Sequence, residues 1–521
     1  MPADRITGVA DSFLEVELKF DLDEGVALPA LDGLPAVASI DPAERYQLEA
    51  TYLDTDDLRL EAHRITLRRR TGGNDAGWHL KLPGGGFART EVHAPLGRSL
   101  RVVPKALLQQ VSVVLRGRPL SPVAVLANER DVIRLRDAAG TLLAEVCDDH
   151  VTATAQGAGT PDGEPVVQRW REVEVELVGG DEALLVAVAD RLATVGAVPS
   201  ASASKLARAL TRRPSPAVGP ARPPKLPRDS AGRELVRYLA GQVARLAVLD
   251  PQVRTDQPDA VHQMRVICRR LRSVLASARP LLDREVTDPI RDELAWLGGA
   301  LGAARDAEVV RDHLVGLLDS QPRPLVIGPV RRRITSTCAA RYRAAHRLAV
   351  AELDGERYRD LLDRLDRLVV EPPLTDRASG PAAVELPSMV LRAWRRTRRL
   401  AAAAEQATPD QRELMLHDVR KAAKRARYAA EAVTAVGGRP ARRFASMIAG
   451  VQQVLGDHQD TVVMRGELLI LMTSAAAAGE PTFSYGRLHA LDECRAAESA
   501  RQYSVAWAAA SAPDLREWLQ P

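Results

Sequence analysis

Aromatic residues are scarce in this chain. They make up 4% of its 521 residues, which argues against a large nucleic-acid platform built on aromatic stacking. The four cysteines lie far apart with no CxxC pair, so the sequence predicts neither a zinc site nor a disulfide framework. No apolar run approaches the roughly 18 residues that a membrane helix needs. The first 20 residues also lack a basic start followed by an apolar core, so we expect a cytoplasmic protein.

What the sequence does contain divides into two parts. Residues 1–213 carry 25 Lys and Arg against 31 Asp and Glu, a net charge of −6, and residues 214–521 carry 47 against 37, a net charge of +10. Short alternating segments precede a proline-rich stretch, and long segments with apolar residues at three- and four-residue spacing follow it. These patterns predict an α+β protein with a strand-rich domain at 1–212, a linker at 213–228 and an all-α domain at 229–521.

The alternating segments place charged residues on one face of each expected strand. Glu15, Glu17 and Lys19 share one face, because successive side chains of a strand point to opposite sides. For any single strand, a solvated face with cross-strand ion pairs is the alternative interpretation. Repeated rows of carboxylates, however, repel one another unless a cation such as Mg²⁺ or Mn²⁺ lies between them, and Arg and Lys beside them bind phosphate oxygens. The pattern therefore predicts an interior that binds a metal and an anion.

The same segments, in order, resemble CYTH domains, the triphosphate tunnel metalloenzymes. Residues 15–19 are similar to the ExExK hallmark, residues 52–55 to a YFDT-type segment, and Arg68 with Arg70 to the RxR motif. The resemblance spans about residues 11–212. Its later parts are the phosphate-binding Lys81, followed by Arg89 and Glu91, the basic Arg130 and Arg134, the acidic Asp148, the late glutamates Glu172, Glu174 and Glu176, and the terminal Lys205.

This resemblance implies a fold and a set of site residues. The expected fold is an eight-stranded antiparallel β-barrel that encloses a tunnel, with Glu15, Glu17 and Lys19 at the catalytic centre. Phosphate would be bound by Lys19, Arg68, Arg70, Lys81, Arg89, Arg130, Arg134 and Lys205. One or two Mg²⁺ or Mn²⁺ ions would be held by Glu15, Glu17, Asp148, Glu172, Glu174 and Glu176. Two points stay open: which pair of the three late glutamates binds metal, and which of the adjacent Asp148 and Asp149 faces the tunnel.

The implied activity is metal-dependent hydrolysis of a triphosphate, with inorganic tripolyphosphate as the first candidate. A CYTH-type adenylyl cyclase and a thiamine triphosphatase would use the same metal and phosphate contacts, so both remain alternatives. A non-catalytic polyphosphate-binding scaffold is a further alternative. Crowded carboxylates argue against it, because they weaken rather than strengthen the binding of an anion.

The helical part contains an internal repeat. Residues 262–272 align without gaps on residues 417–427, and the LGxxxD segment at 301–306 corresponds to the one at 455–460. Two duplicated helical bundles are therefore expected, at about 229–370 and 385–512. In each, the basic segment places a histidine and three cations on one helix stripe. These are His262, Arg265, Arg269 and Arg272 in the first repeat, and His417, Arg420, Lys424 and Arg427 in the second.

This half resembles the CHAD domain, the conserved-histidine α-helical domain, over about residues 229–512. The resemblance implies binding of long-chain inorganic polyphosphate and association with polyphosphate granules in the cytoplasm. A solvated face paired with carboxylates is the alternative for each helix. Nucleic acid is not expected as a partner, because there is no recognition-helix arrangement with base-reading Asn or Gln and no interleaved stacking aromatics. A membrane is not expected either, because the chain has no long apolar run. The implied contacts are the two stripes together with Arg270, Arg305 and Lys421.

Overall fold

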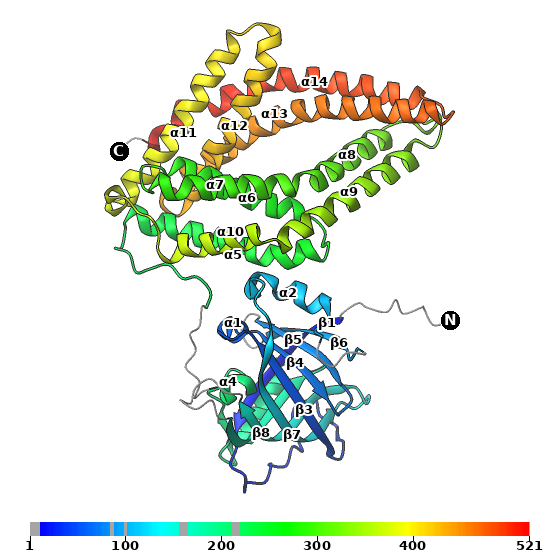
Figure 1. Cartoon of the computed structure of the whole chain (residues 1–521), viewed down its shortest axis with the longest axis vertical. Coiled ribbons are helices and arrows are strands. Elements are labelled where there is room, and N and C mark those ends of the chain that lie inside the picture. The colour runs from blue at the N-terminus through cyan, green and yellow to red at the C-terminus, as the bar shows by residue number, and fades with distance from the viewer. Residues whose placement is uncertain (1–10, 84–87, 98–101, 156–164, 211–218, 520–521) are drawn as a thin grey trace. The chain divides into compact units, whose positions relative to one another are not determined.

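The computed structural model describes residues 11–83, 88–97, 102–155, 165–210 and 219–519 (Figure 1). The chain forms two compact units, residues 1–220 and 221–521. Part of the expected linker, residues 213–218, lies outside the described residues. No helix in the described ranges combines the length and the apolar character needed to cross a bilayer.

The N-terminal unit is built on one antiparallel sheet of ten strands, in the order β10-β1-β6-β5-β4-β3-β7-β8-β9 with β2 beside β7. Two of these strands have only two residues each. The strands are β1 (Asp11–Asp21), β2 (Ser39–Ile40), β3 (Glu44–Asp54), β4 (Thr66–Thr71), β5 (Gly77–Pro83), β6 (Ala88–Pro95), β7 (Ser121–Arg136), β8 (Leu142–Ala155), β9 (Val166–Leu177) and β10 (Val198–Pro199).

The two ends of this sheet meet at β1. Residues 11–16 of β1 pair with β6, and residues 16–21 pair with β9, so that eight strands follow one another around a common interior. Neither β6 nor β9 therefore pairs with the whole of β1, and β10 pairs with its last two residues, Phe20 and Asp21. The expectation of a closed eight-stranded barrel needs correction: the antiparallel architecture is confirmed, but the sheet has ten strands and is not closed along the whole of β1.

The apolar face of this sheet points away from that interior. Val173 and Val175, which alternate with the late glutamates, pack against Leu184 and Val188 of helix α3 (Glu182–Ala193). On another part of the sheet, Leu67, Leu80 and Val92 pack in the same way against α2 (Lys105–Leu115), and α1 (Arg59–Ala62) joins that cluster through Leu60. Because hydrophobic burial is satisfied on the outer face, the inner face is left for charged groups.

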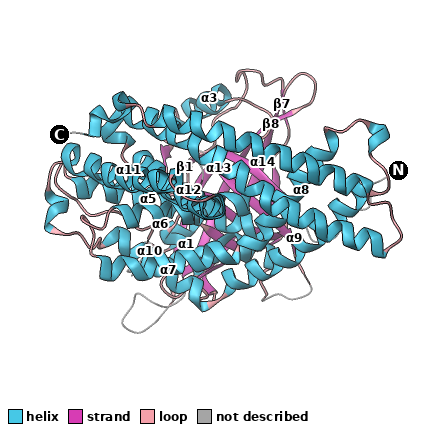
Figure 2. Cartoon of the chain, turned by 90° about the horizontal axis from the view of Figure 1, so that it is seen from above, coloured by secondary structure: helices cyan, strands magenta, loops and turns pink. Residues whose placement is uncertain are grey.

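The C-terminal unit is entirely helical apart from isolated bridges, and α8–α9 and α13–α14 form long hairpins within it (Figure 2). Helix α13 is interrupted at Gly438, whose φ of 54° and ψ of −136° are non-helical. The helices are α5 (Ala231–Arg254), α6 (Ala260–Ser277), α7 (Arg284–Ala300), α8 (Gly302–Asp319), α9 (Val330–Asp354), α10 (Glu356–Val370), α11 (Ala382–Glu405), α12 (Pro409–Ala432), α13 (Thr434–Ala477) and α14 (Phe483–Ala510).

The two sequence repeats share one hydrophobic core. Leu314 of α8 and Cys338 of α9 belong to the first repeat, and they are buried in the same cluster as Met464 of α13 and Tyr485 of α14 from the second. The basic helices α6 and α12 also lie against each other, since Arg269 Nε donates to Tyr428 Oη at 3.2 Å. The repeats are therefore packed together as one unit.

Candidate active site and basic helix pair

The interior of the sheet holds a cavity of about 580 Å³ lined almost entirely by polar and charged side chains. Strand register explains this lining, because Tyr52, Arg68 and His79 are direct cross-strand neighbours on β3, β4 and β5 and all face inward. The lining residues include Glu17, Lys19, Tyr46, Tyr52, Thr66, Arg68, Arg70, Asp75, His79, Lys81, Glu91, His93, Arg130, Arg134, Glu145, Glu174, Glu176 and Lys205.

Glu174 of β9 is the centre of the acidic side of the cavity. Arg130 Nη2 and Lys205 Nζ each lie 2.6 Å from one of its carboxylate oxygens, and Lys19 forms a third ion pair with it. Burial alone would raise the pKa of Glu174, but these three cations outweigh it and hold the pKa well below its usual range. Glu174 is therefore ionised at neutral pH.

Asp149, and not Asp148, faces this interior. Arg130 donates to both carboxylate oxygens of Asp149 at 2.6 Å, and Lys205 Nζ lies 2.9 Å from it. Burial acts to raise the pKa of Asp149, but Arg130 and Lys205 outweigh burial and lower the pKa to about 2. Asp148 instead accepts two hydrogen bonds from Arg171 at 2.8 Å and does not line the cavity. The predicted role of Asp148 as a metal ligand is therefore not supported by its position, because adjacent strand residues point to opposite faces.

The three late glutamates are not equivalent. Glu174 and Glu176 line the cavity, whereas Glu172 is buried beside it, accepts a hydrogen bond from Trp170 Nε1 at 2.6 Å and pairs with Lys205 at 2.6 Å. Carboxylate oxygens of Asp149, Glu172 and Glu174 lie within 4.8 Å of one another. In this structure the ammonium group of Lys205 contacts all three, so a metal ion bound among them would compete with Lys205.

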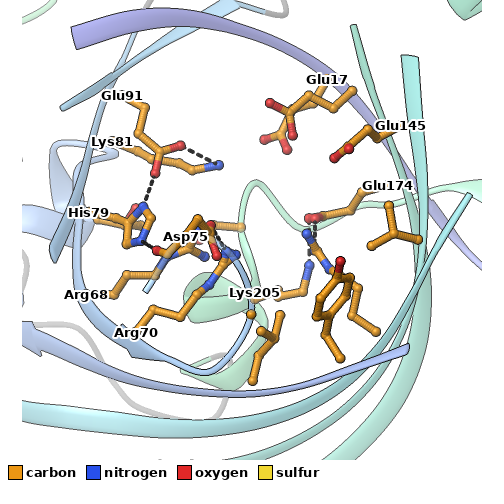
Figure 3. A pocket seen from close by; sticks show the side chains of 18 of the residues that line it. Glu17, Arg68, Arg70, Asp75, His79, Lys81, Glu91, Glu145, Glu174 and Lys205 are labelled. Atoms are coloured by element: carbon orange, nitrogen blue, oxygen red, sulfur yellow. Dashed lines mark hydrogen bonds and ion pairs between the residues drawn. The ribbon is translucent and has the colours of Figure 1, made fainter. Parts of the chain in front are cut away.

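Other carboxylates on the acidic side also offer oxygens to a divalent cation. The Oε1 atom of Glu17 is buried and has no hydrogen-bond partner among the described residues. Burial raises the pKa of Glu17, but Lys19 and Lys81 outweigh this and lower it. Glu17 shares the cavity wall with Glu145 and Glu174 (Figure 3), and Glu176 is its cross-strand neighbour. Ionised carboxylate oxygens that converge on a water-accessible space are the donors that Mg²⁺ and Mn²⁺ prefer.

The opposite side of the cavity is basic (Figure 3). Arg68 is half-buried; its Nη1 lies 3.3 Å from Tyr52 Oη, and its Nε is buried with no hydrogen-bond partner in the described part of the chain. Arg70 pairs with Asp75 at 2.5 Å, and Lys81 lies 3.5 Å from Glu91. These cations are the groups that would bind the oxygens of a phosphate chain.

His79 was not among the predicted site residues, although it lies two positions before Lys81 on the same strand face. Its Nδ1 is 2.6 Å from Glu91 Oε1, and its Nε2 is 2.9 Å from the carbonyl oxygen of Asp75. A carbonyl oxygen only accepts, so Nε2 donates in this contact. Burial lowers the pKa of His79, partly opposed by Glu91. His79 thus links strands β5 and β6 to the loop that carries Asp75.

Three further predicted residues are Glu15, Arg89 and Arg134. Glu15 and Arg89 are opposite each other in the register of β1 and β6, but their side chains lie outside the described part of the structure. Arg134 lines the cavity and is held by Glu145 and Glu44, both at 2.8 Å. Glu145 was not among the predicted site residues, although it lies four residues before Asp149 and therefore on the same face of β8.

In the C-terminal unit, four cations of the predicted stripes form what we call the basic seam: Arg265 and Arg269 of α6, and Arg420 and Lys424 of α12. Burial and the charges of Arg420 and Arg269 lower the pKa of Lys424 to about 8. The arrangement is repeated in the two halves, because Arg265 lies 3.7 Å from Asp306 and Arg420 lies 4.0 Å from Asp460. Like charges held together in this way favour an anionic ligand.

Most of the other cations predicted to contact polyphosphate form ion pairs with carboxylates of the same unit. Arg270 and Arg427 share Glu431 at 3.3 and 2.7 Å. Arg305 pairs with Glu308 and Lys421 with Asp418, while Arg272 is exposed. Burial, together with nearby cations, lowers the pKa of both His262 and His417, which favours the neutral imidazole at pH 7.

The fold and the cavity together define a protein whose strand-built interior is arranged for metal and phosphate and whose second unit carries a basic helical surface. Comparison with known proteins gives the family. The CYTH domain model matches residues 14–210 and the CHAD domain model matches residues 237–469, so the chain belongs to the proteins that carry a CYTH domain followed by a CHAD domain. CYTH domains use divalent metal ions, typically as triphosphatases or cyclases.

Similar proteins include one relative of nearly equal length. The uncharacterised protein MT2285 of Mycobacterium tuberculosis is 42% identical over 489 residues, which cover 91% of this chain and 92% of MT2285. Among solved structures, the CHAD domain from Ricinus communis is 25% identical with a TM-score of 0.43, covering 56% of this chain and 97% of its own. HpAC1 from Hippeastrum, described as revealing a dominant triphosphatase activity, is 15% identical with a TM-score of 0.23, covering 39% of this chain and 98% of its own.

Proposed function

We propose that the N-terminal unit hydrolyses a triphosphate, with inorganic tripolyphosphate as the preferred substrate, and that the C-terminal unit binds long-chain inorganic polyphosphate. The observation that supports the first part is a single cavity in which ionised carboxylates such as Glu17 and Glu174 lie opposite the cations Arg68, Arg70 and Lys81. A divalent cation would bind to the carboxylates and a polyanion to the cations, each in place of part of the ion pairs that these side chains make with one another.

Each side of the cavity has its own part in the proposed reaction. Arg68, Arg70 and Lys81 bind the oxygens of the phosphate chain and fix its position. Glu17, with Glu174 and Glu176, holds Mg²⁺ or Mn²⁺, which when bound polarises the phosphoryl group and lowers the pKa of a bound water. A carboxylate of this side takes the proton from the attacking water. Positioning and charge neutralisation supply most of the rate enhancement.

A substrate panel tests the reaction. We expect the purified protein to release phosphate from tripolyphosphate with Mg²⁺ or Mn²⁺ and to be inactive after chelation of the metal. Faster release from thiamine triphosphate would assign a thiamine triphosphatase. Formation of cyclic AMP and pyrophosphate from ATP would assign a cyclase, and no turnover of any of these compounds would favour a binding scaffold.

Matched variants test the residues. Glu17→Gln and Asp149→Asn should each lower metal-dependent turnover roughly 100-fold or more, because the first removes a metal ligand and the second releases Arg130 and Lys205 from their positions. Asp148→Asn is the control, since its carboxylate pairs with Arg171 away from the cavity. Steady-state kinetics on variants with unchanged melting temperatures give the comparison. Wild-type turnover in Glu17→Gln would contradict the assignment.

A further inference from the structure

The glycines of the two LGxxxD segments lie directly against arginines of the basic seam. A Cβ atom built on Gly302, the first residue of α8, would be 2.9 Å from Nη1 of Arg265. A Cβ atom built on Gly456, inside α13, would be 2.9 Å from Nη2 of Arg420. Both distances are shorter than a normal carbon contact, so each guanidinium occupies the space that a side chain would fill.

The carboxylates of the same segments do not occupy the hydrogen-bond donors of these guanidinium groups. Asp306 and Asp460 lie 3.7 and 4.0 Å from Arg265 and Arg420, beyond hydrogen-bond distance. Nη1 of Arg265 and Nε of Arg420 are buried and have no hydrogen-bond partner within the described residues. The aspartates therefore attract the arginines without using up their donors.

The two arginines are also held among like charges. Burial and the charge of Arg269 lower the pKa of Arg420. Burial and the charges of Arg269 and Arg305 likewise lower the pKa of Arg265. A guanidinium kept in such surroundings gains from an anion that supplies both charge and hydrogen-bond acceptors. The same arrangement occurs in both repeats, which are only partly similar in sequence at these segments.

We infer that Gly302 and Gly456 are positioning residues for polyphosphate: because each lacks a side chain, one seam arginine can lie against its helix, where its guanidinium stays beside the other cations of the seam and binds a phosphate oxygen. This inference rests on the proposed polyphosphate binding of the C-terminal unit. It assigns a function to the glycine of the repeated LGxxxD segment, while the aspartate of that segment supplies the attraction that keeps the arginine in place.

An alanine at either position should change binding without disturbing the fold. The atom that its methyl group would displace is the far end of a flexible side chain, which can rotate away at little cost in stability. The backbone of both glycines is helical, where alanine is the more favourable residue. The guanidinium would move, and its orientation toward the ligand would be lost.

The test compares Gly302→Ala and Gly456→Ala with two control variants in the full-length protein. The controls are Gly299→Ala on α7 and Gly450→Ala on α13, where a Cβ would meet no atom within 4 Å. Titration of long-chain polyphosphate should show roughly tenfold weaker binding for each test variant, the effect of losing one charge-assisted hydrogen bond, and unchanged binding for the controls. Melting temperatures of all four variants should be at or above that of the wild type.

A double-mutant cycle separates positioning from a general effect on the helix. In an Arg420→Ala background, Gly456→Ala should cause no further loss of affinity, because the group that it displaces is gone. Wild-type affinity in both test variants would overturn the inference, as would an equal loss caused by Gly456→Ala in the absence of Arg420. Failure of the wild-type protein itself to bind polyphosphate would instead overturn the proposed function and, with it, the inference.

Discussion

Lys424 shows how the surroundings of a single residue can set the conditions for binding. It is half-buried on α12, and the charged groups that act on it are Arg420, Arg269, Arg265 and the opposing Asp460. Burial is the largest cause of its lowered pKa of about 8. A bound polyanion favours the protonated form, so binding is strongest below this pKa and weakens as the pH rises through it.

This gives a prediction for the pH dependence of polyphosphate binding. The affinity of the wild-type protein should fall between pH 7 and pH 9, whereas Lys424→Arg should flatten that fall because a guanidinium stays charged throughout. Lys421→Arg is the matched control, since Lys421 is exposed and pairs with Asp418 at 3.2 Å. Titrations at constant ionic strength measure the effect, and identical pH profiles for Lys424→Arg and wild type would contradict it.

The pair Asp148 and Asp149 shows why the sequence could not assign every site residue. On β1 and β9, one face is charged and the other apolar, so alternation predicts which residues point inward. On β8 both faces are buried, and apolar residues such as Cys147 and Val146 occupy both. The alternation is lost there, and the inward position of Asp149 follows only from its pairing with Arg130 and with Glu172.

At the scale of the elements, the corner between β3 and α1 depends on Asp54. This fully buried carboxylate accepts hydrogen bonds from the backbone N–H groups of Thr55, Leu60 and Glu61 at 2.7, 2.9 and 2.9 Å. Burial raises its pKa, and the three donors oppose that rise. In the segment 52–55, which is part of the family resemblance, the aspartate thus has a structural function: it holds this corner together.

Removing this carboxylate should destabilise the N-terminal unit. Asp54→Ala leaves three buried donors without their acceptor, and we expect a loss of about 2–4 kcal/mol in the free energy of unfolding. Asp56→Ala, at an exposed position two residues away, is the control. Urea denaturation followed by circular dichroism measures both, and an unfolding free energy equal to wild type in Asp54→Ala would show that the donors find other partners.

Most long elements could be predicted from their periodicity. The alternating segments around Glu17, Arg68, Lys81 and Glu174 are strands, and the basic stripes lie on helices, as expected. The two-residue strands β2 and β10 are too short to leave a pattern. The partial pairing of β1 with both β6 and β9 also escapes sequence analysis, because it depends on how far the strands are staggered around the interior.

At the scale of the whole molecule, the two proposed activities use separate sets of residues. Every lining residue of the cavity comes from the first 205 residues, and the basic seam is formed by α6 and α12. Changes in one set should therefore leave the activity of the other set intact. The change in charge and periodicity at the proline-rich stretch predicted two such parts of the chain. The internal repeat predicted two helical bundles in the second part, but not the hydrophobic core that they share.

Charge reversal of the seam tests this independence. Replacing Arg265, Arg269, Arg420 and Lys424 by Glu should abolish tight binding of long-chain polyphosphate, and the slope of log affinity against log salt should fall by roughly one for each cation that no longer binds a phosphate. Turnover of tripolyphosphate should remain within about twofold of wild type, since no cavity residue is changed. A folded variant with impaired turnover as well would show that the two units act together.

The outer face of the sheet is apolar and its inner face is charged, and this limits which insertions and deletions the chain can accept during evolution. A slip of one residue in any strand would exchange the two faces, driving carboxylates under the helices and valines into the cavity. Length variation inside these strands should therefore be accepted in steps of two residues, while the turns between them remain free to vary by one.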